Sequence, residues 1–280
     1  MGVALILEFV KVMSLSLQKP GTVGLFIFDE GSYLDSTNKP LYSLTFLLPF
    51  IMIYEIGTYF INTDHLGLTQ MRVVTFTWLQ QFAQYFGMDP RLTLAFPGLV
   101  VVVILFCWHM ASHFPWQINI KWLGGMAIES LIYTLPLFFI GFAMNNAAPP
   151  VAAAITGQEG SPSYLANITT SIGAGLYEEL VFRLILIGLI IMLLEDVLKV
   201  KALRATIIAV VFSAVVFSLH HNFGFTSQGQ LTMLAPFTFT SFTFRTIAGG
   251  YFALLFKYRG FGIIVGTHMA YDILTFTLNG

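Results

Sequence analysis

Three ionisable residues lie close together in the middle of a long apolar run. Glu178, Glu179 and Arg183 stand between Tyr164 and Leu194, where most of the neighbouring residues are aliphatic. A charge at the centre of a bilayer costs several kcal/mol, so such residues usually face other protein or a water-filled cavity and mark a functional site. The three side chains are therefore predicted to face the interior of a membrane protein and to do chemistry there.

The spacing gives the two glutamates different roles. On a helix, Glu179 and Arg183 are i,i+4 neighbours in the favourable order, with the acid first, which predicts a structural ion pair. Glu178 lies about 100° away around the helix axis and is left free to face a cavity, where it could act as a general base. The alternative is a buried ion-pair network that only fixes helix packing.

Two further clusters end or interrupt apolar runs. His220 and His221 end the run that begins at Arg204. We expect one of this pair to be an ordinary interfacial residue and the other to point inward, and the sequence alone does not choose between them. In the last apolar run, His268 and Asp272 are four residues apart, which places both side chains on one face of a helix.

These residues supply an acid, two imidazoles and a second acid on three different helices. Glu178 and one histidine could activate a water molecule, while His268 and Asp272 polarise a carbonyl group and hold the developing oxyanion. Alternatively, the histidines and a carboxylate could bind Zn²⁺, with a water in the open position. Either chemistry could hydrolyse an amide.

The composition predicts a membrane protein. Only 10% of the 280 residues are charged, whereas a soluble protein carries about 25%. The net charge of −1 and the lack of a basic run give no support to nucleic-acid binding. The single cysteine excludes an internal disulfide framework.

The elements that must position the site are predicted to form an all-α, polytopic transmembrane bundle. Seven apolar segments approach the roughly 20 residues that a spanning helix needs. They are Leu41–Ile61, Leu92–Ala111, Trp122–Met144, Tyr164–Leu194, Arg204–His221, Pro236–Phe256 and Gly260–Leu278. Met1–Leu17 is predicted to be a short amphipathic segment, Val73–Phe86 an interfacial helix and Asn145–Ser163 a loop. We divide the chain into a peripheral segment (1–40), N-terminal transmembrane helices (41–163) and a catalytic core (164–280).

Cations are unevenly distributed between the two sides of this topology. One side receives nine lysines and arginines and the other receives two, Arg72 and Arg91. The positive-inside rule then places the N-terminus in the cytoplasm and the C-terminus outside. The cations of the richer side are Lys11, Lys19, Lys39, Lys121, Lys199, Lys201, Arg204, Lys257 and Arg259.

Weaker polar signals occur elsewhere in the spans. Glu55 and Glu129 each lie close to a tyrosine, and Arg245 is the best candidate to neutralise one of them or the surplus acid in the fourth span. His109 and His113 have the i,i+4 spacing of metal ligands, but they follow Trp108 at the end of a span. An interfacial belt of aromatic and histidine residues is the preferred interpretation.

At the three clusters, the chain resembles the CAAX prenyl protease and bacteriocin-processing (CPBP, Abi-type) intramembrane proteases. That family carries EExxxR, FxxxH and HxxxN/D motifs on separate membrane helices. They correspond here to Glu178-Glu179-x-x-x-Arg183, Phe217-x-x-x-His221 and His268-x-x-x-Asp272. The resemblance covers the C-terminal part of the chain, from about Tyr164 to Gly280.

The resemblance implies an intramembrane endopeptidase. Glu178 would activate water with His221 as its partner, and His268 and Asp272 would stabilise the oxyanion. If Zn²⁺ is bound, its ligands would be His221, His268 and Glu178. The substrate would be a membrane-embedded or lipid-anchored protein or peptide, and the enzyme a multi-pass protein of a prokaryotic cell membrane.

Two other functions are compatible with the same residues. The chain could be a non-catalytic membrane immunity or peptide-binding protein that keeps the fold. It could also be a transporter, since intramembrane acids and histidines build proton relays. The sequence shows neither the repeated halves nor the paired broken helices of transporters, and three intact motifs favour the enzyme.

Overall fold

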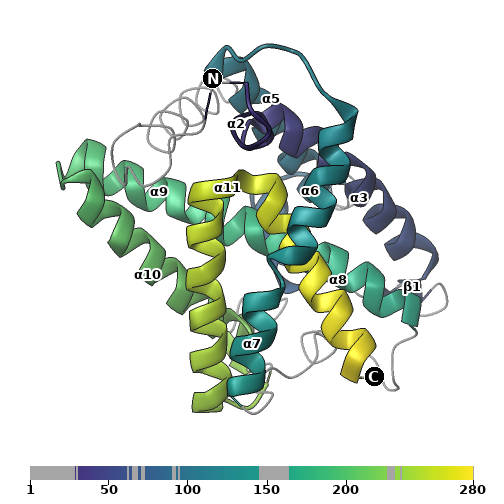
Figure 1. Cartoon of the computed structure of the whole chain (residues 1–280). Helices are drawn as coiled ribbons and strands as arrows, with labels where there is room; N and C mark the ends of the chain where they lie inside the picture. Colours follow the sequence, from purple (N-terminus) through teal and green to yellow (C-terminus); the bar gives the residue numbers. More distant parts are fainter. Residues whose placement is uncertain are drawn as a thin grey trace.

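The computed structural model describes residues 29, 31–61, 63–64, 69–70, 73–89, 93, 95–144, 164–225, 231–233 and 235–279. In these residues the fold is almost wholly helical (Figure 1). The α-helices are α2 (Tyr33–Thr37), α3 (Pro40–Phe60), α4 (Val74–Tyr85), α5 (Phe96–Ser112), α6 (Ile120–Ile132), α7 (Leu135–Ala143), α8 (Tyr164–Glu179), α9 (Gly188–Ile191), α10 (Ala202–His220) and α11 (Phe239–Asn279). Two π-helical segments are η3 (Leu180–Ile187) and η4 (Met192–Val197).

Two short antiparallel hairpins complete the described elements. They pair β1 (Thr63–Asp64) with β2 (Thr69–Gln70), and β3 (Phe223–Phe225) with β4 (Leu231–Met233). The amphipathic segment predicted at Met1–Leu17 and the loop predicted at Asn145–Ser163 lie outside the described residues.

The predicted all-α membrane bundle is confirmed. Among the described residues, four helical stretches are long and apolar enough to cross a bilayer: Pro40–Phe60, Ile120–Ala143, Ala202–His220 and Phe239–Leu278. The last of these contains two of the predicted spans, α5 is apolar but shorter, and the consecutive helical segments from α8 to η4 cover the remaining one. Helices therefore occur at each of the seven predicted segments.

Helix α11 organises the bundle around a sharp break. It packs against α6, α8 and α10, while α3 packs against α5 and α8. The break is at Gly260, whose φ of 76° and ψ of −179° are not helical. In Figure 1 the two arms of α11 form an inverted V with its apex toward α2. At this apex the side chain of Asn38 donates a hydrogen bond to the carbonyl of Tyr258 (3.5 Å).

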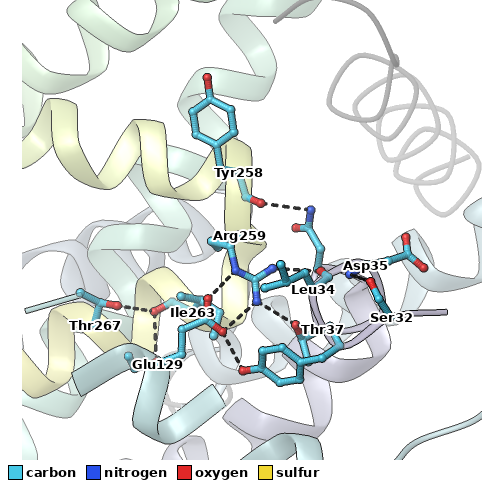
Figure 2. Close-up of polar contacts among 12 residues, drawn as sticks. Ser32, Leu34, Asp35, Thr37, Glu129, Tyr258, Arg259, Ile263 and Thr267 are labelled. Atoms are coloured by element: carbon cyan, nitrogen blue, oxygen red, sulfur yellow. Dashed lines mark hydrogen bonds and ion pairs between the residues drawn. The ribbon is translucent and has the colours of Figure 1, made fainter. Parts of the chain in front are cut away.

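A buried arginine fixes the apex. Figure 2 shows Arg259 held between Glu129 of α6 and residues of α2. Its guanidinium bonds both carboxylate oxygens of Glu129, at 2.5 and 2.8 Å, and also the hydroxyl of Thr37 and the carbonyl of Leu34. Tyr33 donates its hydroxyl to the same carboxylate at 2.7 Å. Burial and this hydrogen bond raise the pKa of Tyr33, so the hydroxyl keeps the proton that it donates.

The partner of Glu129 is thus Arg259, which the predicted topology placed beyond the end of its span. Arg245, the expected candidate, does not take this role. It interacts electrostatically with Glu178, the surplus acid of the fourth span, which was the other expected partner. The other span glutamate, Glu55, accepts a hydrogen bond from the hydroxyl of Tyr177 on α8 at 3.1 Å.

The sequence pattern placed Arg259 outside the membrane because the pattern did not reveal that α11 turns back directly at Gly260.

Gly260→Ala is expected to destabilise the protein. A backbone with this φ and ψ is accessible essentially only to glycine and costs other residues about 1–3 kcal/mol, and a Cβ here would also lie 3.0 Å from the carbonyl oxygen of Asn38. The matched control is Gly250→Ala in the first arm, where a Cβ meets nothing within 4 Å and alanine favours the helix. Thermal unfolding in detergent measures both. A Gly260→Ala protein that melts as high as Gly250→Ala would contradict this account.

Candidate active site

The carboxylate of Glu178 lies where three imidazoles from two other helices meet. Glu178 is 5% exposed. The Nε2 atoms of His220, His221 and His268 lie 3.4, 3.9 and 3.8 Å from its oxygens. The C-terminal end of α10 reaches Glu178 and brings both of its histidines to the carboxylate. Four chemically active side chains therefore share one buried space.

The end of α10 orients both of its histidines in the same way. The Nδ1 atoms of His220 and His221 lie 2.5 and 2.9 Å from the carbonyl oxygen of Phe217. A carbonyl can only accept, so Nδ1 carries the hydrogen in each ring and Nε2 is directed toward Glu178. Asn222 follows, and its amide donates to the carbonyls of Ala235 and Pro236. These bonds tie the end of α10 to the segment that leads into α11.

Glu179 holds two cationic or hydrogen-bonding groups at once. Its Oε2 lies 3.1 Å from Nε of Arg183, and both side chains are fully buried. Its Oε1 lies 2.7 Å from Nδ1 of His268. Arg183 also donates to the carbonyl of Gly249 in the first arm of α11, at 3.3 Å. The pair assigned from i,i+4 spacing therefore extends to His268 and joins both arms of α11 to α8.

Asp272 lies one turn beyond His268 on α11. It is 5% exposed, and its Oδ2 is 3.5 Å from Nε2 of His268. Nδ1 of His268 is directed to Glu179, and Nε2 on the opposite edge of the ring therefore lies near both Asp272 and Glu178. The HxxxD spacing brings the two side chains to one side of the helix, as the sequence predicted.

A close approach between α8 and α11 makes these distances possible. Gly175 lies one turn before Glu178, and a Cβ there would lie 3.0 Å from the backbone nitrogen of Met269 and from the carbonyl of Val265. A larger residue would push α8 away from α11 and separate Glu178 from His268. Directly after Glu179 the helix becomes π-helical, a rare geometry that is frequent at functional sites.

Aromatic rings close the site on several sides. His268 stacks on Phe252 with ring centroids 4.8 Å apart and planes at 17°. The guanidinium of Arg183 lies 4.1 Å from the centre of the Phe217 ring. Trp78 of α4 meets His220 edge-on at 5.9 Å. This apolar wall limits the polar groups that can compete with a substrate.

All of the predicted site residues are brought together by the fold. Glu178, His221, His268 and Asp272 share the site, and the pair of Glu179 and Arg183 lies directly behind it. Sequence reasoning missed His220, which is closer to Glu178 than His221 is and is more deeply buried. The signal was the His–His–Asn end of α10, where one histidine was expected to be interfacial. It also missed Trp78, for which the sequence held no signal.

The atoms best placed for a metal differ from the predicted ligands. One ligand atom from each of Glu178, His220 and His221 lies within 4.8 Å of the others. The predicted set had His268 in place of His220. In the structure His268 is held by Glu179 through Nδ1 and faces Asp272 with Nε2. The second histidine of the possible ligand set is therefore His220, which precedes His221 in the chain.

A comparison with protein families agrees with the motifs. Residues 160–274, which contain the four predicted catalytic residues, match the family described as type II CAAX prenyl endopeptidase Rce1-like. No curated protein and no solved structure matches the chain. The C-terminal part of this integral membrane protein therefore carries an Rce1-like domain, of the protease family that the three motifs predicted.

Proposed function

We propose that this protein is an intramembrane endopeptidase of a prokaryotic cell membrane. It would hydrolyse a peptide bond of a membrane-embedded or lipid-anchored protein or peptide with a water activated by Glu178. The observation that carries the proposal is the buried carboxylate of Glu178 facing three imidazole Nε2 atoms inside an Rce1-like domain. The substrate class and the prokaryotic membrane rest on the resemblance to the family.

In the first step, water attacks the carbonyl carbon of the substrate. Because Nδ1 of His220 and of His221 bonds the carbonyl of Phe217, their neutral rings present Nε2 as an acceptor. A water between these rings and Glu178 would direct one hydrogen to an imidazole and give its other proton to the carboxylate. General-base assistance of this kind typically contributes a factor of about 10²–10⁴.

The oxyanion that forms needs a positively polarised partner, and His268 can supply one. Its Nδ1–H is donated to Glu179. We propose that Nε2 also carries a proton, which Asp272 and Glu178 support with their negative charge and which then bonds the oxyanion. Asp272 would thus act through His268 and hold its ring in place. As the C–N bond breaks, Glu178 returns its proton to the leaving amine.

The same residues also fit Zn²⁺. Glu178, His220 and His221 form a donor set of two imidazoles and a carboxylate, a ligand combination known from catalytic zinc sites. Both histidines donate Nδ1–H to a backbone carbonyl, as metal-bound histidines usually do. When bound, the ion would supply acidity to a coordinated water. Phe217 would then fix the ring orientation of two ligands.

Dialysis of the purified protein against a chelator distinguishes the mechanism without a metal from the mechanism with Zn²⁺, called here the glutamate form and the metal form. The glutamate form predicts unchanged cleavage after dialysis. The metal form predicts loss of cleavage, its recovery on addition of Zn²⁺, and a lower zinc content in the His220→Phe protein. Elemental analysis of the purified protein gives this second readout without any need for a substrate.

His220→Phe is expected to lower the cleavage rate by about 10–100-fold, toward the lower end of a general-base contribution, because His221 still offers Nε2 to the water. Phenylalanine keeps the ring packing against Phe182 and Trp78 but removes Nε2. The rate is measured in lipid vesicles beside that of His221→Phe. A His220→Phe enzyme with wild-type activity, next to an inactive His221→Phe enzyme, would restrict the role to His221.

The proposed activity is tested with defined peptides. Purified protein in lipid vesicles is incubated with one peptide in three forms: free, prenylated and fused to a transmembrane helix. New N-termini are detected by mass spectrometry. Cleavage of either membrane-bound form but not of the free peptide supports the proposed substrate class. Cleavage of the free peptide alone would overturn it.

A further inference from the structure

A cavity of about 310 Å³ lies at the apex end of the bundle, between the N-terminus of α3 and the C-terminus of α5. Its polar lining consists of Ser36, Lys39, Tyr42, His109, Gln117 and Asn119. No aspartate or glutamate is among the described residues that line it. A lining rich in donors and without carboxylates suits an anion.

His109 is the strongest indication of a ligand. Its side chain is 1% exposed, and neither ring nitrogen has a hydrogen-bond partner among the described residues. Leaving a buried polar group unpaired costs about 1–3 kcal/mol. The interfacial belt expected from the sequence is only partly present: Trp116 meets the His109 ring edge-on at 4.3 Å but offers the nitrogens no acceptor or donor.

Positive charge comes from Lys39 and from the helix that it caps. Lys39 is the N-cap of α3, and Pro40 is its first residue. Leu41 and Tyr42 also line the cavity, and their backbone amides lie in the first turn, where an amide has no partner within the helix. A helix N-terminus carries a partial positive charge and favours anions.

The carboxylate nearest to Lys39 belongs to a neighbouring cavity. Asp35 accepts a bond from Lys39 at 2.8 Å and lines a second cavity of about 380 Å³, which Lys39 and Lys257 also line. Asp35 does not line the first cavity, although its ion pair with Lys39 offsets part of the charge of that lysine.

The surrounding tryptophans favour a position near the lipid headgroups. Trp122 lines it, Trp116 contacts His109, and Trp108 lines the second cavity. These are three of the four tryptophans in the chain, and tryptophan is enriched at the membrane–water interface. The phosphates of the bilayer lie at this depth.

We propose that this cavity binds a phosphate group, supplied by a phospholipid headgroup or by free phosphate, with Lys39, His109 and the first amides of α3 as its donors. The site is separate from the proposed proteolytic centre. From Leu41 to Tyr54, whose ring packs against Tyr177 beside Glu178, α3 extends about 20 Å at 1.5 Å per residue.

Native mass spectrometry of the full chain in detergent tests the proposal with three probes. They are dihexanoyl phosphatidylglycerol, dihexanoylglycerol with the same acyl chains and no phosphate, and inorganic phosphate. We expect the phosphatidylglycerol to bind about tenfold or more tightly than the dihexanoylglycerol, the ratio that corresponds to one charge-assisted hydrogen bond. If inorganic phosphate binds more weakly than phosphatidylglycerol, the natural ligand is a lipid headgroup. If the two bind with equal affinity, the natural ligand is free phosphate. Equal affinity for the two lipids, with no binding of phosphate, would overturn the site.

Variants locate the site. Lys39→Met and His109→Phe are each expected to weaken phosphatidylglycerol binding about tenfold. The control Lys121→Met removes an exposed lysine of α6 that does not line the cavity and should bind as the wild type does. If the His109→Phe protein does not fold, the phosphatidylglycerol affinity of the Lys39→Met protein tests the site by itself. A monodisperse Lys39→Met protein that binds with wild-type affinity would refute the proposal.

Discussion

Glu178→Gln is expected to lower the rate of peptide cleavage by about 10²–10⁴-fold, the usual contribution of a general base, while the protein still folds. Glutamine has nearly the same shape and can donate a hydrogen bond to Nε2 of His220, which lies 3.4 Å from the carboxylate. It cannot accept a proton from water. Initial rates in lipid vesicles give the loss, and thermal unfolding in detergent shows that the fold is intact.

The control for this experiment is Glu195→Gln. It makes the same change in η4, in the last turns of the same helical run and away from the imidazoles. Its cleavage rate should equal that of the wild type. Comparable activity in Glu178→Gln and Glu195→Gln proteins would remove Glu178 from the mechanism, whatever the remaining residues do.

Glu179→Gln is expected to cost about 3–5 kcal/mol of unfolding free energy, the usual cost of removing one partner of a buried ion pair. Arg183 and Glu179 are both fully buried, so the arginine would keep its charge without the adjacent carboxylate. The same substitution also weakens the bond that holds Nδ1 of His268. Thermal unfolding in detergent should show a clearly lower midpoint.

Two further proteins make this result specific. Glu179→Gln/Arg183→Met removes both charges and should recover part of the lost stability, because no unpaired charge stays buried. Asp35→Asn breaks another i,i+4 pair, with Lys39, whose side chains are 28% and 19% exposed, and should cost less than about 1 kcal/mol. Equal losses in Glu179→Gln and Asp35→Asn would show that burial of the first pair does not matter.

The spacing of polar residues within apolar runs predicted the helices and much of the site. The i,i+4 relation placed Glu179 beside Arg183, and the same spacing placed His268 and Asp272 on one face. These relations lie within single helices, so helical geometry alone determines them. The seven apolar segments likewise follow from the length that a bilayer requires.

Contacts between helices could not be predicted in this way. The bond from His268 to Glu179 depends on how closely α8 approaches α11 at Gly175, which no pattern within one helix determines. The equal orientation of His220 and His221 depends on the carbonyl of Phe217 at the end of α10. Arg259 was expected in a loop, and it is buried because α11 turns back at Gly260.

The most direct measurement compares membranes of cells that express the wild-type, Glu178→Gln or Glu195→Gln protein at equal levels, with all protein N-termini mapped by mass spectrometry. The proposed mechanism predicts new N-termini in membrane-associated proteins with the wild type and with Glu195→Gln, and none of them with Glu178→Gln. Identical maps for all three, under growth conditions in which the gene is normally expressed, would contradict proteolysis and favour a non-catalytic immunity or peptide-binding protein.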